Sequence, residues 1–183
     1  MKLLVKPFKI IISILLIATI LISAIFILKI IFPDDYGSTI EKYSKKYGVD
    51  NYTVLALIKA ESNFNPDAVS HKNAKGLMQL TEETFMFCKS NIKLGENILN
   101  PEVNIDAGVW YLSFLSDKFN SNIKNVLASY NAGASNVTKW LGNEKYSPNG
   151  ITLENAPYAE THNYIKRVLR YRKIYYLLYP QYR

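Results

Sequence analysis

A single glutamate near the end of an apolar helix is the first candidate for chemistry. In the stretch LALIKAESNFNP, at a turn of about 100° per residue, Val54, Leu57 and Ile58 form one apolar face, and Glu61 falls within it. Removal from water raises the pKa of a carboxyl group, because the charged form loses more solvation than the neutral form. A glutamate that stays protonated near neutral pH can act as a general acid. The alternative is a structural glutamate that pairs with a lysine or extends to solvent.

Three further clusters place amides, tyrosines and a second carboxylate in unusual settings. Tyrosine, asparagine and glutamine together suit a sugar, since a flat ring covers a pyranose face and amides bind hydroxyl and acetamido groups. Each cluster alone is a weak signal. The candidates are Gln79 in GLMQL at 76–80, Tyr130 and Asn131 in SYNAGA at 129–134, and Glu160 and Tyr164, one helical turn apart, in NAPYAETHNYI at 155–165.

The sequence offers little for a metal or a cofactor. Cys88 is the only cysteine, so an intrachain disulfide and a cysteine-based metal cluster are excluded. His71 and His162 are the only histidines and are too few for a convincing metal site. We therefore expect chemistry carried by side chains alone.

Helical signals dominate the elements that must position these residues. Ser38 and Glu41 have the spacing of a capping box, and a helix that ends before Pro66 carries Glu61. Residues 63–76 are rich in turn formers and predict an irregular loop. No segment has a sustained strand pattern, so the predicted fold class is all-α. Further helices are predicted to start at Thr81, Asn100 and Asn122, to end at Gly48, Gly133 and Gly142, and to run from about Tyr158 to Tyr179.

The N-terminal part of the chain predicts a membrane anchor. Residues 10–28 contain no charge, and a helix of that length spans roughly the hydrocarbon core of a bilayer. Lys2, Lys6 and Lys9 precede this run and favour a cytoplasmic N-terminus with the rest of the chain outside. A cleaved signal peptide is the alternative. The predicted organisation is a short N-terminus and anchor at 1–32, a linker at 33–37 and one domain at 38–183.

The charge balance of the outer part does not favour nucleic acid as a partner. Residues 33–183 hold 18 of the 22 basic residues and all 15 acidic ones, which leaves a mild positive excess. The last helix mixes basic and aromatic residues, a pattern that also fits a solvated basic face opposite an aromatic core face. A contact with anionic lipid stays open because the anchor is close.

The order and spacing of four motifs resemble the soluble lytic transglycosylase family. The motifs are ES at 61–62, GLMQ at 76–79, YNAG at 130–133 and ETHNY at 160–164, and the resemblance extends over nearly everything after Gly37. It implies a lysozyme-like helical fold related to goose-type lysozyme, of the glycoside hydrolase family 23 type. It also implies cleavage of peptidoglycan between N-acetylmuramic acid and N-acetylglucosamine.

Matched residue by residue, the resemblance makes Glu61 the single catalytic acid and base, with Ser62 beside it. This sequence departs from the family pattern at two places. Thr81 and Glu82 stand where the family commonly has Met-Pro, and Ser129 replaces a small alanine. The other matched positions are Ser70 and Gln79, which bind the glycan or its peptide stem, Tyr130 and Asn131 near the scissile bond, Glu160, which organises the site, and Tyr164, which supports it.

The resemblance implies a membrane-bound enzyme that leaves a 1,6-anhydromuramic acid end and needs no cofactor. The expected partners are peptidoglycan strands and the membrane, and nothing in the sequence identifies a protein partner. Two alternatives stay open at this stage. One is a muramidase that uses water on the same fold, and the other is a tethered glycan-binding module without activity.

Overall fold

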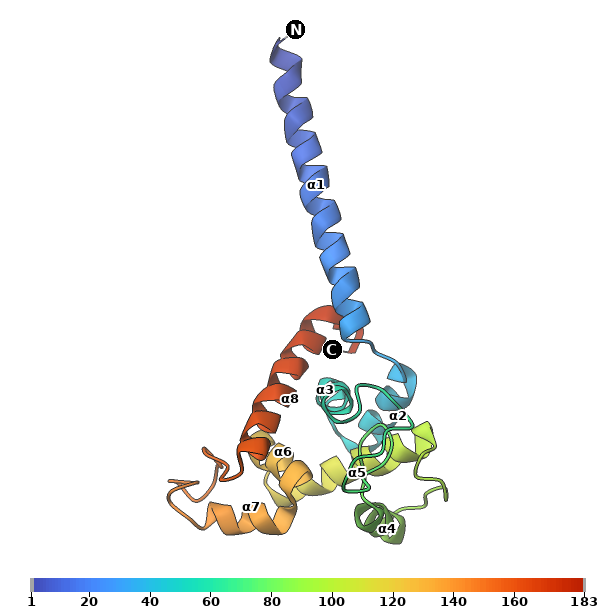
Figure 1. Cartoon of the computed structure of the whole chain (residues 1–183), viewed down its shortest axis with the longest axis vertical. Coiled ribbons are helices and arrows are strands. Elements are labelled where there is room, and N and C mark those ends of the chain that lie inside the picture. Colours follow the sequence, from blue (N-terminus) through green and yellow to red (C-terminus); the bar gives the residue numbers. More distant parts are fainter. Residues whose placement is uncertain (1, 183) are drawn as a thin grey trace. The chain divides into compact units, whose positions relative to one another are not determined.

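The computed structural model describes residues 2–182, with side chains from residue 9, and consists of helices joined by turns and loops (Figure 1). No β-strand occurs in this range, although isolated bridges join Val69 to Lys75 and Lys75 to Leu80. The all-α prediction is confirmed. The helices are α1 (Lys2–Ile31), α2 (Gly37–Tyr47), α3 (Asn51–Glu61), α4 (Glu82–Asn91), α5 (Pro101–Lys118), α6 (Ile123–Ala132), α7 (Ala134–Leu141), α8 (Ala159–Leu178) and the short 3₁₀ helix η1 (Pro180–Tyr182).

The chain divides into two compact units between Asp34 and Asp35. The first unit consists of α1, and the second, the globular unit, holds all the other helices. Within α1, the segment Lys9–Ile31 is long and apolar enough to cross a membrane by length and composition. Nearly all of its side chains are exposed.

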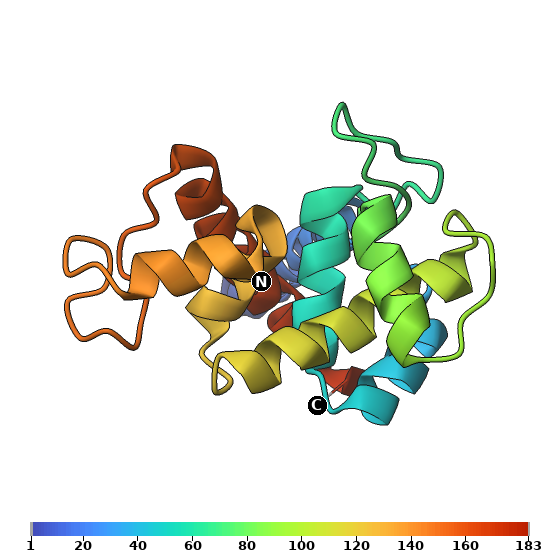
Figure 2. The same cartoon turned by 90° about the horizontal axis from the view of Figure 1, so that it is seen from below.

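Helix α3 forms the centre of the globular unit (Figure 2). Residues 54–58 are completely buried on every side of the helix, and α3 packs mainly against α8. A helix that is apolar all round belongs in a core. The single apolar face predicted from Val54, Leu57 and Ile58 was therefore too narrow, because Leu55 and Ala56 on the other sides are buried as well.

Most helix ends follow local capping signals. The side chains of Thr81, Asn100 and Asn122 accept hydrogen bonds from the first turns of α4, α5 and α6. Gly48 ends α2 in the left-handed conformation. The capping box predicted from Ser38 and Glu41 is wrong, since α2 begins at Gly37 after a left-handed Tyr36 with no side-chain cap.

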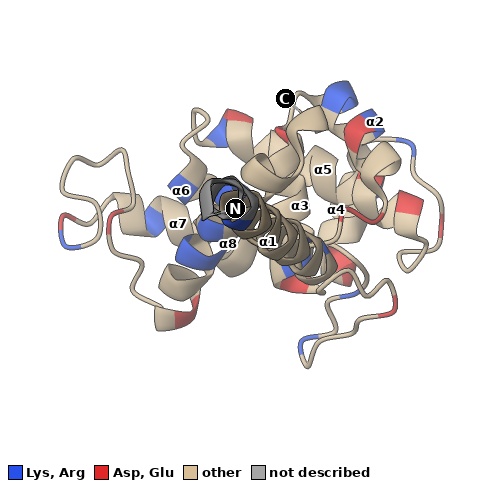
Figure 3. Ribbon diagram, turned by 90° about the horizontal axis from the view of Figure 1, so that it is seen from above, with Lys and Arg blue, Asp and Glu red and all other residues tan. Residues whose placement is uncertain are grey.

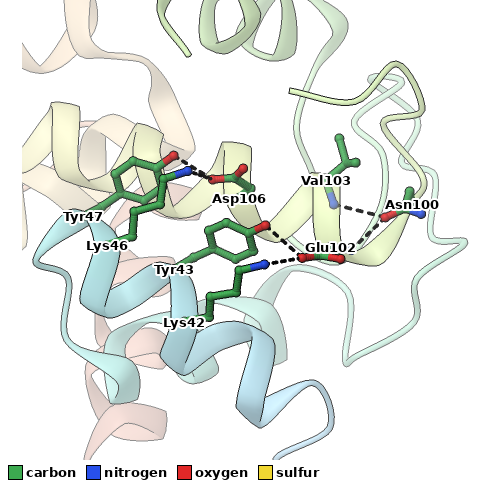
Figure 4. A network of polar contacts seen from close by, with 8 residues as sticks. All are labelled: Lys42, Tyr43, Lys46, Tyr47, Asn100, Glu102, Val103 and Asp106. Atoms are coloured by element: carbon green, nitrogen blue, oxygen red, sulfur yellow. Dashed lines mark hydrogen bonds and ion pairs between the residues drawn. The ribbon is translucent and has the colours of Figure 1, made fainter. Parts of the chain in front are cut away.

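Two matching pairs of polar contacts fasten α2 to α5 (Figure 4). The pairs repeat one turn apart on both helices, which fixes the register of α2 on the helix that also carries Asn104. Ion pairs of exposed lysines contribute little to stability individually. The hydrogen bonds from the two tyrosine hydroxyls, which are partly buried between α2 and α5, therefore contribute most to this contact. Lys42 Nζ and Tyr43 Oη donate to Glu102 Oε1 at 2.7 and 3.0 Å, and Lys46 Nζ and Tyr47 Oη donate to Asp106 Oδ1 at 3.2 and 2.7 Å.

Candidate active site

Glu61 is the last residue of α3 and is held by a tyrosine from α8. Tyr164 Oη donates to Glu61 Oε1 at 2.6 Å, and the Tyr164 side chain is 2% exposed. Directly after the helix, Asn63 and Phe64 take left-handed backbone conformations that turn the chain away. The packing of α3 on α8 therefore brings together two residues that are 103 positions apart in the sequence.

The surroundings of Glu61 favour its protonated form. The pKa of Glu61 is raised from 4.5 to about 7, mainly by burial and to a smaller extent by the charge of Glu160. The hydrogen bond from Tyr164 and the charge of Arg167 act in the opposite direction, because both stabilise the carboxylate. Burial also raises the pKa of Tyr164 well above its ordinary value, so this phenol stays a donor. A proton can thus leave and return to Glu61 near neutral pH.

The GLMQ loop is shaped by a buried asparagine on α5. Asn104 Nδ2 donates to the carbonyls of Lys75 and Ile98 at 3.0 and 2.8 Å, and Asn104 Oδ1 accepts from the Met78 amide at 2.8 Å. Gly76 has a φ of +76°, and a Cβ there would lie 2.4 Å from Asn104 Nδ2. Both observations require glycine at this position.

Gln79 follows in a left-handed conformation, with a φ of 50°. Its Nε2 donates to the carbonyls of Ala68 and Gly76 at 3.0 and 2.9 Å, which ties the two sides of the loop together. Both donor hydrogens of the amide are thereby used, and Oε1 makes no hydrogen bond to the described residues. GLMQ forms a turn before α4, and Gln79 lines a depression that also contains Glu61.

Tyr130 and Asn131 are fixed from two directions. Tyr130 Oη donates to the carbonyl of Met78 at 2.8 Å, and its ring lies 5.7 Å from that of Tyr111. Thr161 Oγ1 donates to Asn131 Oδ1 at 2.8 Å, which leaves the Asn131 NH₂ group as the side that can donate to a ligand. The GLMQ loop, α5 and α8 therefore hold these two α6 side chains in place.

A depression of about 180 Å³ collects most of the predicted residues. Tyr164 lies behind Glu61 as its hydrogen-bond donor. Ser62 does not line the depression, since its hydroxyl donates to the Ile58 carbonyl at 3.2 Å. The predicted residues that line it are Glu61, Ser70, Gln79, Tyr130, Asn131 and Glu160.

Four lining residues were not among the predicted site residues: His71, Lys72, Ala74 and Thr81. The first three belong to a tight turn in which Ser70 accepts from the amides of Asn73 and Ala74. Turn composition gives no hint that this segment borders a cleft. Among residues 9–182, no group of three or more His, Cys, Asp or Glu side chains is placed to hold a metal ion.

The sequence matches a family model over its central part. Residues 38–150 match the model of the transglycosylase SLT domain. The chain belongs to this family. The SLT domain therefore accounts for α2 to α7, including Glu61 and four of the other five predicted residues that line the depression, whereas Glu160 and Tyr164 lie beyond the matched range.

Relatives and solved structures agree with the SLT assignment. The chain is 32% identical over 150 residues to the soluble lytic murein transglycosylase of Salmonella typhimurium strain LT2, covering 79% of this chain and 23% of the relative. It is 34% identical over 166 residues to the membrane-bound lytic murein transglycosylase C of Cronobacter sakazakii, covering 76% and 46%. The lytic transglycosylase Slt of Pseudomonas aeruginosa, solved as an inactive mutant, superposes with a TM-score of 0.71 at 33% identity, covering 81% and 25%.

This chain thus spans about a quarter of the soluble relatives and less than half of the membrane-bound one. The shared part is the all-helical SLT domain, which confirms the predicted lysozyme-like family and fold. A membrane association agrees with the apolar α1 and with the names of the membrane-bound relatives.

Proposed function

We propose that this protein is a membrane-anchored lytic transglycosylase that cleaves peptidoglycan between N-acetylmuramic acid and N-acetylglucosamine. The observation that carries the proposal is Glu61, a partly buried carboxyl group whose pKa lies near 7 in a depression lined by tyrosine and amide groups. Membership in the SLT family supports the reaction class. The depression suits a sugar, since it combines the ring of Tyr130 with the amides of Gln79 and Asn131.

In the proposed reaction, Glu61 serves as both acid and base. Protonated Glu61 gives its proton to the glycosidic oxygen while the bond from that oxygen to the muramic acid C1 breaks. The resulting carboxylate then accepts the proton of the muramic acid C6 hydroxyl, whose oxygen forms the new bond to C1. The product is a 1,6-anhydro sugar, no water is consumed, and Glu61 ends protonated as it began.

The two-carboxylate arrangement of ordinary glycosidases is not required for this route. Glu160 lines the same depression, and its negative charge raises the pKa of Glu61. We assign Glu160 the role of keeping Glu61 protonated and ordering the site. The substrate's own acetamido group is the proposed stabiliser of positive charge at C1, as the family resemblance implies.

Mass spectrometry of the products distinguishes this reaction from its alternatives. The full chain in detergent is incubated with purified peptidoglycan, and we expect anhydromuramic acid ends. Ends heavier by one water would instead identify a muramidase. An absence of new ends, with retained binding to the glycan, would identify a tethered binding module.

For the membrane, we propose that α1 is a single-pass anchor with the globular unit on the outer side of the cytoplasmic membrane. Lys2, Lys6 and Lys9 lie before the apolar segment, which favours a cytoplasmic N-terminus. This arrangement places the depression on the same side as the cell wall. The domain boundaries at 1–32, 33–37 and 38–183 are proposed on the same basis.

Replacing Tyr164 with phenylalanine is expected to shift the pH dependence of cleavage. The lost hydrogen bond stabilised the carboxylate, so the pKa of Glu61 rises in Tyr164→Phe and the alkaline limb of the pH–rate profile moves to higher pH. We expect about a tenfold loss of rate at the optimum, because the carboxyl group is also less well oriented.

The exposed Tyr158 offers a matched control, since Tyr158→Phe removes a hydroxyl at the start of α8 without touching Glu61. Rates are measured from pH 5 to 9 with soluble glycan fragments. A Tyr164→Phe profile that moves to lower pH would contradict the assignment of this hydrogen bond.

A further inference from the structure

One face of α8 is a strip of positive charge that ends in an exposed leucine. Lys166, Arg170, Lys173 and Leu177 follow each other at intervals of four, three and four residues, so their side chains project within a narrow sector of the helix. We call these four residues the α8 strip. Its three basic side chains are exposed, and Leu177 is 73% exposed.

The α8 strip lacks acidic partners. Glu160, in the first turn, is the only acidic residue of α8, and it belongs to the depression at the other end of the helix. The ion pair that α8 does form joins Arg172 to Asp50 and lies on a different side of the helix. Among residues 9–182, no carboxylate pairs with Lys166, Arg170 or Lys173. Figure 3 shows the blue Lys and Arg segments along α8.

The short linker between α1 and α2 limits how far the globular unit, and with it the α8 strip, can lie from a membrane that α1 spans. Five residues separate Ile31, the end of α1, from Gly37, the start of α2, and they reach at most about 20 Å. A unit of about 150 residues is roughly 40 Å across. If α1 spans a bilayer, the globular unit therefore stays within about 20 Å of its surface, which is close enough for one face of the unit to reach the lipid headgroups.

The end of α8 is well placed to be that face. Tyr52 Oη, in the first turn of α3, donates to the Tyr179 carbonyl just after α8 at 2.9 Å, which fixes the end of α8 at the start of α3. In Figure 1 the first turn of α2 and the last turns of α8 lie toward the same end of the globular unit. Glu160 lies about 25 Å along α8 from Leu177, so this contact leaves the depression open to glycan.

From these observations we infer that the α8 strip is a docking surface for anionic phospholipid in the membrane that holds α1. The inference rests on the proposed anchor. Arg170 and Lys173 attract lipid phosphates, and Leu177 enters the boundary between headgroups and acyl chains. The tether makes even a weak contact effective, because binding becomes intramolecular.

Site-specific labelling of the full chain in nanodiscs tests the docking surface. A fluorophore is attached to Leu177→Cys, with Ile151→Cys, 68% exposed in the loop before α8, as the comparison site. The native Cys88 is buried and its thiol pKa is raised to about 12, so the label goes to the introduced cysteine. Nanodiscs contain phosphatidylglycerol and phosphatidylcholine, with a quencher attached to the lipid near the headgroup.

We expect quenching at position 177 to exceed that at position 151 at least threefold. Adding Arg170→Glu and Lys173→Glu should reduce it to the level of position 151, whereas Lys118→Glu with Lys139→Glu, which changes the net charge equally, should leave it unchanged. Equal quenching at both positions, or quenching that survives the Arg170 and Lys173 reversals, would overturn the inference. The inference would also be overturned if soluble polyphosphate changed the fluorescence of the label and the bilayer did not quench it, since the partner would then be a soluble polyanion.

Two further readouts keep the separate proposals apart. Failure of the chain to co-elute with nanodiscs would remove the anchor and the docking surface together. Peptidoglycan cleavage is measured on the same samples, and the Arg170 and Lys173 reversals should leave cleavage of soluble glycan fragments within twofold of the unaltered chain, because neither residue lines the depression.

Discussion

Replacing Glu61 with glutamine is expected to abolish glycan cleavage while the globular unit stays folded. Glutamine fills the same space but can neither donate nor accept the proton that both halves of the proposed reaction require. General acid or base catalysis alone typically contributes a factor of 10² to 10⁴, and here one group supplies both, so we expect a loss of at least about 10³. Release of anhydromuropeptides from purified peptidoglycan measures the effect.

Glu144→Gln is the matched control, because Glu144 is an exposed glutamate in the loop before α8 that does not line the depression. It should retain full activity. Activity in Glu61→Gln comparable with that of Glu144→Gln would show that another group carries the proton.

Glu61→Gln should also make the protein more stable at alkaline pH. The pKa of Glu61 is about 7 in the folded state and about 4.5 in the unfolded chain, so the folded state binds this proton more tightly. The contribution of protonated Glu61 to the free energy of unfolding is fully present below pH 4.5 and is lost as the pH rises through 7. At pH 8 Glu61→Gln should therefore exceed the unaltered protein by up to about 3 kcal/mol in its free energy of unfolding, with no such gain at pH 4.

The largest expected loss of stability outside the apolar core comes from Asn104→Leu. Leucine keeps most of the volume but leaves the Met78 amide and the Ile98 carbonyl without a partner, whereas the Lys75 carbonyl keeps its hydrogen bond from the Leu80 amide at 3.1 Å. Each unsatisfied buried group costs about 1–3 kcal/mol, so we expect a total of about 3–5 kcal/mol. The midpoint and slope of urea unfolding of the full chain in detergent give the change.

Asn91→Ala, at the exposed end of α4, should cost less than about 0.5 kcal/mol under the same conditions. Asn104→Leu should also lower activity by more than its unfolded fraction explains, because the GLMQ loop carries Gln79. A loss of stability as small as that of Asn91→Ala would mean that Asn104 does not hold the loop.

The prediction of helices succeeded where the signal is local. A cap such as Thr81 or Asn100 acts on amides two or three residues away, so neighbouring residues are enough to identify it. The Ser38 capping box failed because the left-handed Tyr36 precedes a helix that begins two residues earlier than predicted, at Gly37. The breadth of the buried surface of α3 was also missed, since periodicity alone does not reveal how many helices surround a core helix.

The residues of the candidate site were likewise predicted only in part. Sequence motifs identified Glu61, Ser70, Gln79, Tyr130, Asn131 and Glu160, and the structure brings all six to one depression. The lining by His71 and Lys72 was not foreseen, because the path of an irregular loop depends on what it packs against. Ser62 was predicted to bind substrate, and its hydroxyl bonds to its own helix.

By itself the sequence determined the helical class, the apolar segment of α1, the SLT family and the identity of the central carboxylate. Only the tertiary structure decided the chemical state of that carboxylate. The pKa of Glu61 depends on how much water its neighbours exclude and on Tyr164, Arg167 and Glu160, which approach from α8 about a hundred residues later. Residue types and capping are properties of short segments, whereas desolvation and charge at one atom are sums over everything that packs around it.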